Sequence, residues 1–379
     1  MSLSKLESLP NEILMDFLEK HANGVDILVA FAKQLNSRID GLIAQCQQLR
    51  FDFIRCRKDN FLLCVSLFPL LIDKISELAL LEWDTPGQIN TFLSFFPSFR
   101  PFKTLRTLYF HFDAATITSK EVDKALGSLR NLKNLNTLSI KVAHALEAPL
   151  MRIIVELFCL PTLKRLSVAI GEGKSEWTFM NPWIPDSFNI EHLTITGMPF
   201  QWNDLQLIIQ CSRHLRYVNV RLTKTRLYLS QEGISIQLDY VPNLQTLILH
   251  FEEDDPTTFD MVAKLLRATY NICWLELTVH DALIKASAWE HLIQNALPHL
   301  THFLLRTSSY RLKKRILEEV LISFRTSFWV AKNNFYILIL DDEHLLNSKD
   351  TMNHICGRKQ QTSNHENTEF RTALVHPIN

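Results

Sequence analysis

A six-residue apolar pattern close to L-x-x-L-x-[ILV] recurs along this chain and constrains its fold more than any other feature. Its copies begin at Ile75, Leu105, Leu135, Leu163, Ile190, Leu215, Leu244, Ile272 and Leu300, so successive copies start 25 to 30 residues apart. Alternating apolar and polar residues are typical of a half-buried strand. A nearly fixed period of this length indicates stacked repeats that share one core. We therefore expect a solenoid with one strand in each repeat.

Helices are expected in several of the intervals between these strands. The spacing of apolar residues predicts amphipathic helices over residues 120–129, 150–158, 205–211, 261–269 and 289–296. Two intervals differ: 171–189 contains two prolines and is typical of a loop, and 223–241 is rich in β-forming residues and favours an added hairpin. A helix over 311–329 and a strand over 335–340 are expected to close the array. The polar composition of 341–379 predicts a mobile tail.

The strand-and-helix period resembles leucine-rich repeats of the longer type. The resemblance implies an α/β solenoid, with parallel strands on a concave side and helices on a convex side. One departure is that the usual Asn or Cys after the strand is missing; Asp113, Ala143 and Gly171 stand at three such positions. We therefore expect residues 73–340 to form a divergent, leucine-rich-repeat-like solenoid of about nine repeats with a C-terminal cap.

Residues 4–46 carry a different pattern, that of three short amphipathic helices. Ser8 is expected to cap the first helix, which Asn23-Gly24 ends, and Asp26 is expected to cap the second. Three helices in about forty residues bury too little surface to be stable alone. A partner for the remaining apolar surface is therefore expected.

The order LP-x-E-[IL]-L-x-x-[IF]-L, followed by D-[IL]-L, resembles the F-box over this segment. The Trp that F-boxes commonly carry after the third-helix polar stretch is missing at Arg38-Ile39-Asp40. The resemblance implies docking onto a Skp1-type linker protein of a cullin-RING ubiquitin ligase, and the expected contact residues are Leu9, Pro10, Ile13, Leu14, Phe17, Leu18, Ile27 and Leu28. The alternative is that these helices only cap the repeats. Residues 47–72 are expected to be a helical linker and N-terminal cap.

The target would bind the outward-facing strand residues on the concave side. Alternate residues of a strand face opposite sides of the sheet, and Tyr, Trp and Arg are enriched at protein interfaces. The expected target-binding residues are Tyr109, His111, Lys141, Arg165, His192, Tyr217, Asn219, Arg221, His250, Trp274, Glu276, His302 and Arg306. An F-box followed by such repeats implies a non-catalytic substrate adaptor of an SCF-type (Skp1–cullin–F-box) ubiquitin ligase. The alternative is a scaffold or inhibitor-type protein-binding module that joins no ligase.

Composition argues against several other functions. Lys plus Arg and Asp plus Glu are equal at 40 each, so no global basic field favours nucleic acid or an anionic membrane. The sequence has no HExxH, CxxC, GxGxxG or P-loop motif, so we expect no metal, no cofactor, no small-molecule substrate and no active site. The seven cysteines are scattered, and no stretch approaches 18 apolar residues. Both features favour a cytoplasmic or nuclear protein.

Overall fold

The computed structural model describes residues 9–31, 37–82, 86–112, 126–142, 156–158, 160–170, 188–222, 241–251, 257–279, 283–308, 319–320, 322–331, 335–340 and 373–374. The chain divides into two compact units. The first, called here the N-terminal unit, comprises Met1–Pro199 and Cys211–Leu215; the second, the C-terminal unit, comprises Phe200–Gln210 and Arg216–Asn379.

Three short helices open the N-terminal unit, as the sequence predicts: α1 (Asn11–Lys20), α2 (Gly24–Phe31) and α3 (Ser37–Gln45). Pro10 occupies the N-cap position of α1, and Ser8 lies outside the described residues. The cap expected at Asp26 is wrong. Helix α2 begins two residues before Asp26, and the side chain of Asn23 accepts a 3.1 Å hydrogen bond from the Val25 N–H. Asp26 therefore lies inside the first turn, where its negative charge interacts favourably with the helix dipole.

The segment 47–72 is not wholly helical, which corrects the prediction made for it. It begins with strand β1 (Leu49–Asp52), and only then come helix α4 (Lys58–Leu71) and a short 3₁₀ helix η1 (Ile72–Lys74). Leu49 and Phe51 are buried while Arg50 and Asp52 are exposed, the alternation of a strand with one covered face. Strand β1 pairs in parallel with β2 (Ile75–Leu81), so the sheet starts one strand earlier than predicted.

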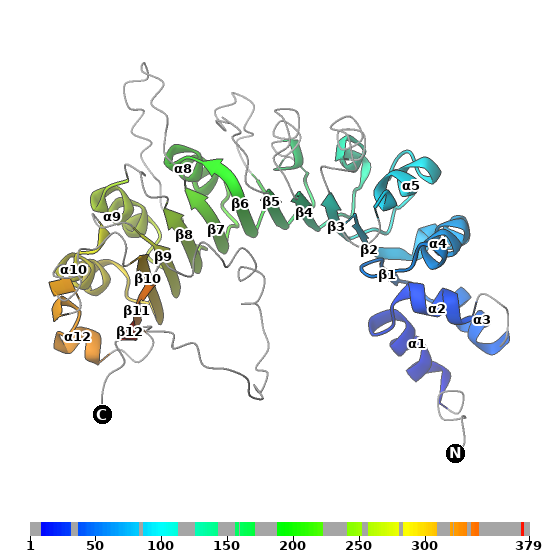
Figure 1. Cartoon of the computed structure of the whole chain (residues 1–379), viewed down its shortest axis with the longest axis horizontal. Helices are drawn as coiled ribbons and strands as arrows, with labels where there is room; N and C mark the ends of the chain where they lie inside the picture. Colours follow the sequence, from blue (N-terminus) through cyan, green and yellow to red (C-terminus); the bar gives the residue numbers. More distant parts are fainter. Residues whose placement is uncertain are drawn as a thin grey trace. The chain divides into compact units, whose positions relative to one another are not determined.

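In the N-terminal unit, strands follow one another across the sheet in chain order (Figure 1). After β2 come β3 (Thr107–Phe112), β4 (Thr137–Val142), β5 (Arg165–Ile170) and β6 (His192–Phe200), each parallel to the strand before it. Helix α5 (Gln88–Phe95) and the 3₁₀ helix η2 (Ser128–Asn131) occupy the connections. The predicted strands of this unit are thus confirmed, with their leucines buried.

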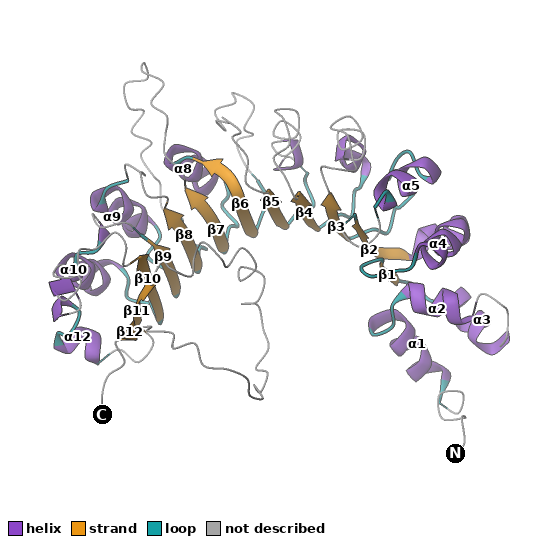
Figure 2. Ribbon diagram, in the orientation of Figure 1, coloured by secondary structure: helices purple, strands orange, loops and turns teal. Residues whose placement is uncertain are grey.

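The C-terminal unit repeats this arrangement. Its elements are α8 (Trp202–Cys211), β7 (Tyr217–Leu222), β8 (Thr246–Phe251), α9 (Phe259–Ala268), β9 (Trp274–Thr278), α10 (Ala286–Ala296), β10 (His302–Ser308), α12 (Ser327–Val330), β11 (Phe335–Leu340) and β12 (Ala373–Leu374). Strands β7 to β11 are parallel neighbours, and β12 pairs antiparallel with β11. Two residues of the predicted tail therefore belong to the sheet. Helices α8, α9 and α10 cover one face of the strands (Figure 2).

Several sequence predictions fall largely outside the described residues. They are the loop at 171–189, the hairpin at 223–241 and most of the tail. Only the final parts of the helices expected over 120–129 and 150–158 are described, and these parts are helical. Together, the parallel strands and the helices on one face are consistent with an α/β solenoid-like fold.

Side-chain amides link neighbouring repeats just before their strands begin. Asn134 donates to the carbonyl of Lys103 at 2.6 Å, Asn189 to that of Pro161 at 2.8 Å, and Asn271 to that of Pro242 at 2.7 Å. Each bond spans 28 to 31 residues of sequence. These bonds supply side-chain-to-backbone links between repeats at the start of the strand, although the usual Asn or Cys after the strand is missing.

Candidate protein-binding surfaces

Helix α1 carries apolar side chains on two different faces. Leu14 and Leu18 are buried, whereas Ile13 is 53% exposed and Phe17 is 43% exposed. Residues four apart in a helix lie on the same face, so Ile13 and Phe17 form one apolar patch on the surface of α1. Neighbouring exposed apolar residues are a feature of interaction sites.

A mostly apolar groove lies beside this patch. It has a volume of about 330 Å³ and is lined from all three helices, by Leu14 and Phe17 of α1, Ile27 of α2 and Leu42 of α3 among others. Its polar lining comes mainly from His21, Asn23 and Asp26. The groove can receive an apolar side chain from a partner.

The residues expected to contact a Skp1-type protein fall into two groups. Pro10, Ile13 and Phe17 are exposed and Leu9 is half-buried. The remaining four, Leu14, Leu18, Ile27 and Leu28, are buried in the helical core. Leu14, Leu18 and Ile27 of this second group also line the groove, so a partner can reach them there, whereas Leu28 does not line it.

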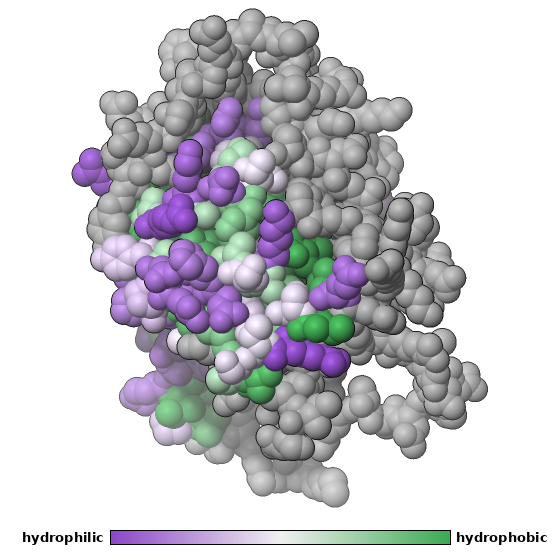
Figure 3. Space-filling view, turned by 90° about the vertical axis from the view of Figure 1, so that its left-hand side faces the viewer, coloured by the Kyte–Doolittle hydropathy of each residue, from purple (hydrophilic) through white to green (hydrophobic). Residues whose placement is uncertain are grey.

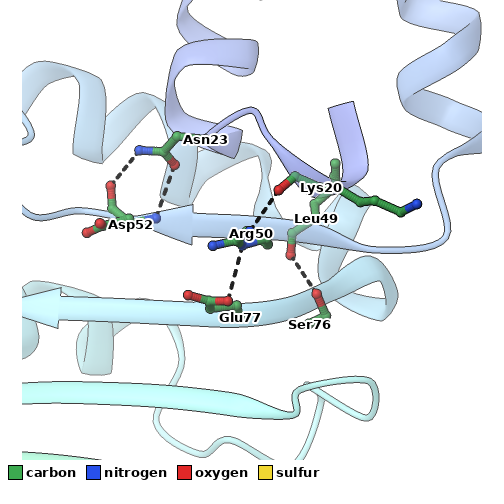
Figure 4. Close-up of polar contacts among 7 residues, drawn as sticks. All are labelled: Lys20, Asn23, Leu49, Arg50, Asp52, Ser76 and Glu77. Carbon is green, nitrogen blue, oxygen red and sulfur yellow. Dashed lines mark hydrogen bonds and ion pairs between the residues drawn. The ribbon is translucent and has the colours of Figure 1, made fainter. Parts of the chain in front are cut away.

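Polar contacts attach α1 and α2 to the first strand (Figure 4). Arg50 of β1 donates to the carbonyl of Lys20 at the end of α1 at 2.8 Å, and it also pairs with Glu77 of β2 at 3.1 Å. Asn23 makes two bonds with the backbone of Asp52, donating to its carbonyl at 2.8 Å and accepting from its N–H at 3.1 Å. The helices are therefore joined directly to the sheet.

In each unit, the face of the strands opposite the helices is called here the strand face; it consists of the outward residues of β1 to β6 in the N-terminal unit and of β7 to β11 in the C-terminal unit. In the N-terminal unit, Tyr109 and Arg165 are exposed on it, and Lys141 and His192 are half-buried. His111 is only 8% exposed, which contradicts its expected role as an exposed contact. The cause is its neighbours across the sheet: Leu81 and Lys141 flank His111, whereas the smaller Ala79 and Ser139 flank Tyr109.

In the C-terminal unit, every predicted strand-face residue is half-buried or exposed. Trp274 and His302 stack, with ring centroids 3.5 Å apart and an interplanar angle of 14°. The indole N–H of Trp274 donates to Glu276 at 2.8 Å, and the other carboxylate oxygen of Glu276 pairs with Arg306 at 3.3 Å. These four side chains from β9 and β10 thus form one connected cluster.

Near the other end of these strands, His250 lies close to two arginines. Burial, and then the positive charges of Arg306 and Arg221, lower the pKa of His250 to about 4. Its Nδ1 atom lies 3.0 Å from the hydroxyl of Thr278 in a hydrogen bond. The imidazole is therefore neutral at pH 7 and sits among positive charges.

Sequence reasoning missed one member of the strand face, Tyr336 of β11. Its ring centroid lies 5.9 Å from that of His302. The signal in the sequence is the apolar alternation of Phe335, Ile337 and Ile339, because a residue between two inward-facing strand residues points outward.

A third surface lies between the C-terminal ends of α9 and α10. It is a hollow of about 390 Å³ with Arg267, Tyr270 and His291 in its lining. Figure 3 looks at the side of the molecule that lies at the left in Figure 1, where hydrophilic residues lie among and around hydrophobic ones. The lining of the hollow includes Arg267, His291 and Asn295, so the hollow is more polar than the groove between α1, α2 and α3.

The described part of the chain contains no group of three or more His, Cys, Asp and Glu residues that could hold a metal ion. No helix among the described residues is long and apolar enough to span a bilayer. Cys46, Cys56, Cys64, Cys211 and Cys273 are free thiols.

Neither a family model nor a curated protein matches the sequence of this chain.

Proposed function

We propose that this chain is a non-catalytic substrate adaptor of an SCF-type ubiquitin ligase. Its N-terminal helices would dock onto a Skp1-type linker protein, and its strand face would bind a target protein. The observation that carries the proposal is the exposed pair Ile13 and Phe17, on the helix of the LPNEIL segment and beside an apolar groove. The proposed location is the cytoplasm or the nucleus.

The energetics favour a partner for this patch. Fully burying a large apolar side chain contributes about 1.5–3 kcal/mol relative to leaving it exposed. Ile13 and Phe17 are each about half exposed, so covering both and filling the groove adds a few kcal/mol to an interface. Such a patch with an adjoining pocket is the arrangement in which a few central residues dominate binding.

The adaptor would act by positioning the target protein. The ubiquitin-transfer chemistry would belong to the partner ligase, while this chain holds the target near it and so raises its effective concentration. This role requires an attachment site and a target site on one chain. It requires no metal, cofactor, nucleic acid or small-molecule substrate.

A second function is favoured by a different observation. The Arg50 side chain of β1 donates to the Lys20 carbonyl, and Asn23 bonds to the backbone of Asp52. A simple N-terminal cap needs such bonds, since they satisfy polar groups at the first strand of the sheet. In that case the chain would be a scaffold or inhibitor-type binding module, and Ile13 and Phe17 would be incidental surface residues.

Co-purification with a Skp1-type protein separates the two functions. The double variant Ile13→Asp/Phe17→Asp is compared with the wild type and with Leu70→Asp, a matched control that changes a 79% exposed residue on α4. We expect the wild type and the control to bind and the double variant to lose binding, with the circular dichroism of all three unchanged. Absence of binding by the wild type would remove the adaptor function and leave the scaffold.

A further inference from the structure

The sheet of the C-terminal unit ends in two strands of very different length. Strand β11 pairs in parallel with β10 along all six of its residues, Phe335–Leu340. Strand β12, the last in the strand order, has two residues, Ala373 and Leu374. These two residues pair antiparallel with Ile339 and Leu338 of β11. A very short strand from near the end of the chain therefore forms this edge of the sheet.

The sequence of β11 is poorly suited to an edge. Its six residues read FYILIL, all aliphatic or aromatic, with no charge, no glycine and no proline. An edge strand of this kind pairs readily with a strand of another chain, and native proteins protect such edges with charged residues, proline or a very short edge strand. Because β11 itself carries neither a charge nor a proline, β12 is the protection that the described residues supply.

Strand β12 has the features of a protective cover. It extends the edge by only two residues, and Pro377 follows three positions after Leu374. Proline has no N–H to donate to a strand ladder. A strand this short offers a further chain little backbone to pair with, whereas it still occupies part of the backbone of β11.

A second copy of the chain is the partner that best fits β11 once β12 has left. The edge accepts β12 in antiparallel orientation, and two identical strands related by a two-fold axis also pair antiparallel. Each copy brings the same uncharged sequence to the contact. The formal net charge of the chain is zero, so little long-range repulsion opposes the approach of two copies.

We propose that the edge of β11 is a self-association surface that β12 covers, and that release of β12 lets β11 of a second copy pair there in antiparallel orientation. Both strands compete for the same backbone of β11, so a chain is closed by its own β12 or joined to a copy. The C-terminal segment thus sets the oligomeric state. This property is separate from the adaptor function, since it involves neither a Skp1-type protein nor a target.

The test uses the full chain with Ala373→Pro/Leu374→Pro, because two prolines remove the backbone donors of β12. Sedimentation velocity compares this variant with the wild type and with Gln360→Pro/Gln361→Pro, a matched control elsewhere in the C-terminal segment. We expect the wild type and the control to be monomers, and the β12 variant to form dimers whose fraction rises with concentration. A monomeric β12 variant, or equal dimerisation of all three chains, would overturn the inference. So would open-ended aggregates, because a two-fold pairing closes on itself.

A peptide added in trans locates the contact. The peptide of residues 369–379, EFRTALVHPIN, carries the β12 sequence, and its control carries Ala373→Pro/Leu374→Pro. We expect the first peptide to return the β12 variant to a monomer, and to bind it about tenfold more tightly than the wild type, whose own β12 competes as an intramolecular ligand. The control peptide should do neither. A dimer that persists in saturating β12 peptide would place the interface elsewhere and overturn the inference.

A charge in β11 provides an independent check. Leu338 pairs with Leu374, and lysine is a residue with which native edge strands prevent pairing with other chains. Leu338→Lys, added to the Ala373→Pro/Leu374→Pro variant, should restore the monomer while the circular dichroism of the chain stays unchanged. Dimers that form equally well with a folded Leu338→Lys chain would exclude β11 as the contact.

Discussion

The side-chain amide of Asn271 donates a 2.7 Å hydrogen bond to the main-chain carbonyl of Pro242, twenty-nine residues earlier in the chain. Asn271 immediately precedes the apolar pattern of its repeat, and Pro242 lies two residues before the pattern of the preceding repeat. The bond therefore links nearly equivalent points of two neighbouring repeats. Asn134 makes the corresponding bond to Lys103. Hydrogen bonds from polar side chains to backbone groups of a neighbouring repeat are one way in which stacked units stabilise each other.

Asn271→Ala should lower the free energy of unfolding by about 1 kcal/mol, because the carbonyl of Pro242 loses its side-chain donor. Urea unfolding followed by circular dichroism measures it. Asn134→Ala should cost a similar amount, and the two losses should add because the sites share no partner. Asn131→Ala is the control, since the Asn131 amide donates to the Ser128 carbonyl within its own turn and makes no bond between repeats among the described residues. An Asn271→Ala variant as stable as the control would show that the inter-repeat bond contributes nothing.

Glycines in two adjacent helices should respond to alanine in opposite ways. A Cβ atom on Gly24 would lie 2.7 Å from the Phe51 ring, so Gly24→Ala should destabilise the chain by about 1–3 kcal/mol through overpacking. A Cβ on Gly41, inside α3, meets nothing within 4 Å, and Gly41→Ala should stabilise by up to about 1 kcal/mol through helix propensity. Thermal unfolding of both variants measures the difference. Equal shifts would contradict the close packing of α2 on β1.

Stability should fall as the pH is lowered from about 6.5 to about 4, in part because of His250. Its folded-state pKa of about 4 lies below its usual value of 6.5, so the unfolded chain binds the proton first in that window. The full contribution is about 3 kcal/mol, present above pH 6.5 and lost progressively below it. His250→Gln removes the titrating group while keeping a polar side chain beside Thr278. The difference between the wild-type and variant stability curves should slope in this window; parallel curves would contradict the assignment.

The free cysteines should differ sharply in reactivity. Burial raises the pKa of Cys64 to about 12, and its side chain is fully covered, so almost no accessible thiolate exists at pH 8. Cys273 is half-buried and within reach of solvent. Iodoacetamide labelling followed by peptide mass mapping should modify Cys273 in the native chain and Cys64 only after unfolding. Modification of both at one rate would contradict the burial of Cys64.

The sequence predicts the strands β2 to β11 because each carries its own alternating apolar pattern. It does not predict β1, where the alternation lasts only four residues and the strand exists through its pairing with β2. Tertiary pairing outweighs so short a local signal.

The candidate surfaces are likewise predictable from the sequence only in part. Repeat spacing predicts that Trp274 and His302 are neighbours, since both occupy the first outward position of their strands. The burial of His111 depends on the size of Leu81 and Lys141 beside it, and this requires the register between strands. The division of the α1 residues into exposed and buried groups likewise depends on how three helices pack.

The attachment of α1 and α2 to β1 has a mechanical consequence. A flexible tether would let the N-terminal helices tumble independently of the sheet, whereas Arg50, Asn23 and the close approach at Gly24 form a stiff joint. Whatever docks on Ile13 and Phe17 then acquires a fixed orientation relative to β1, and a pull on that docked body is transmitted straight into the first strand.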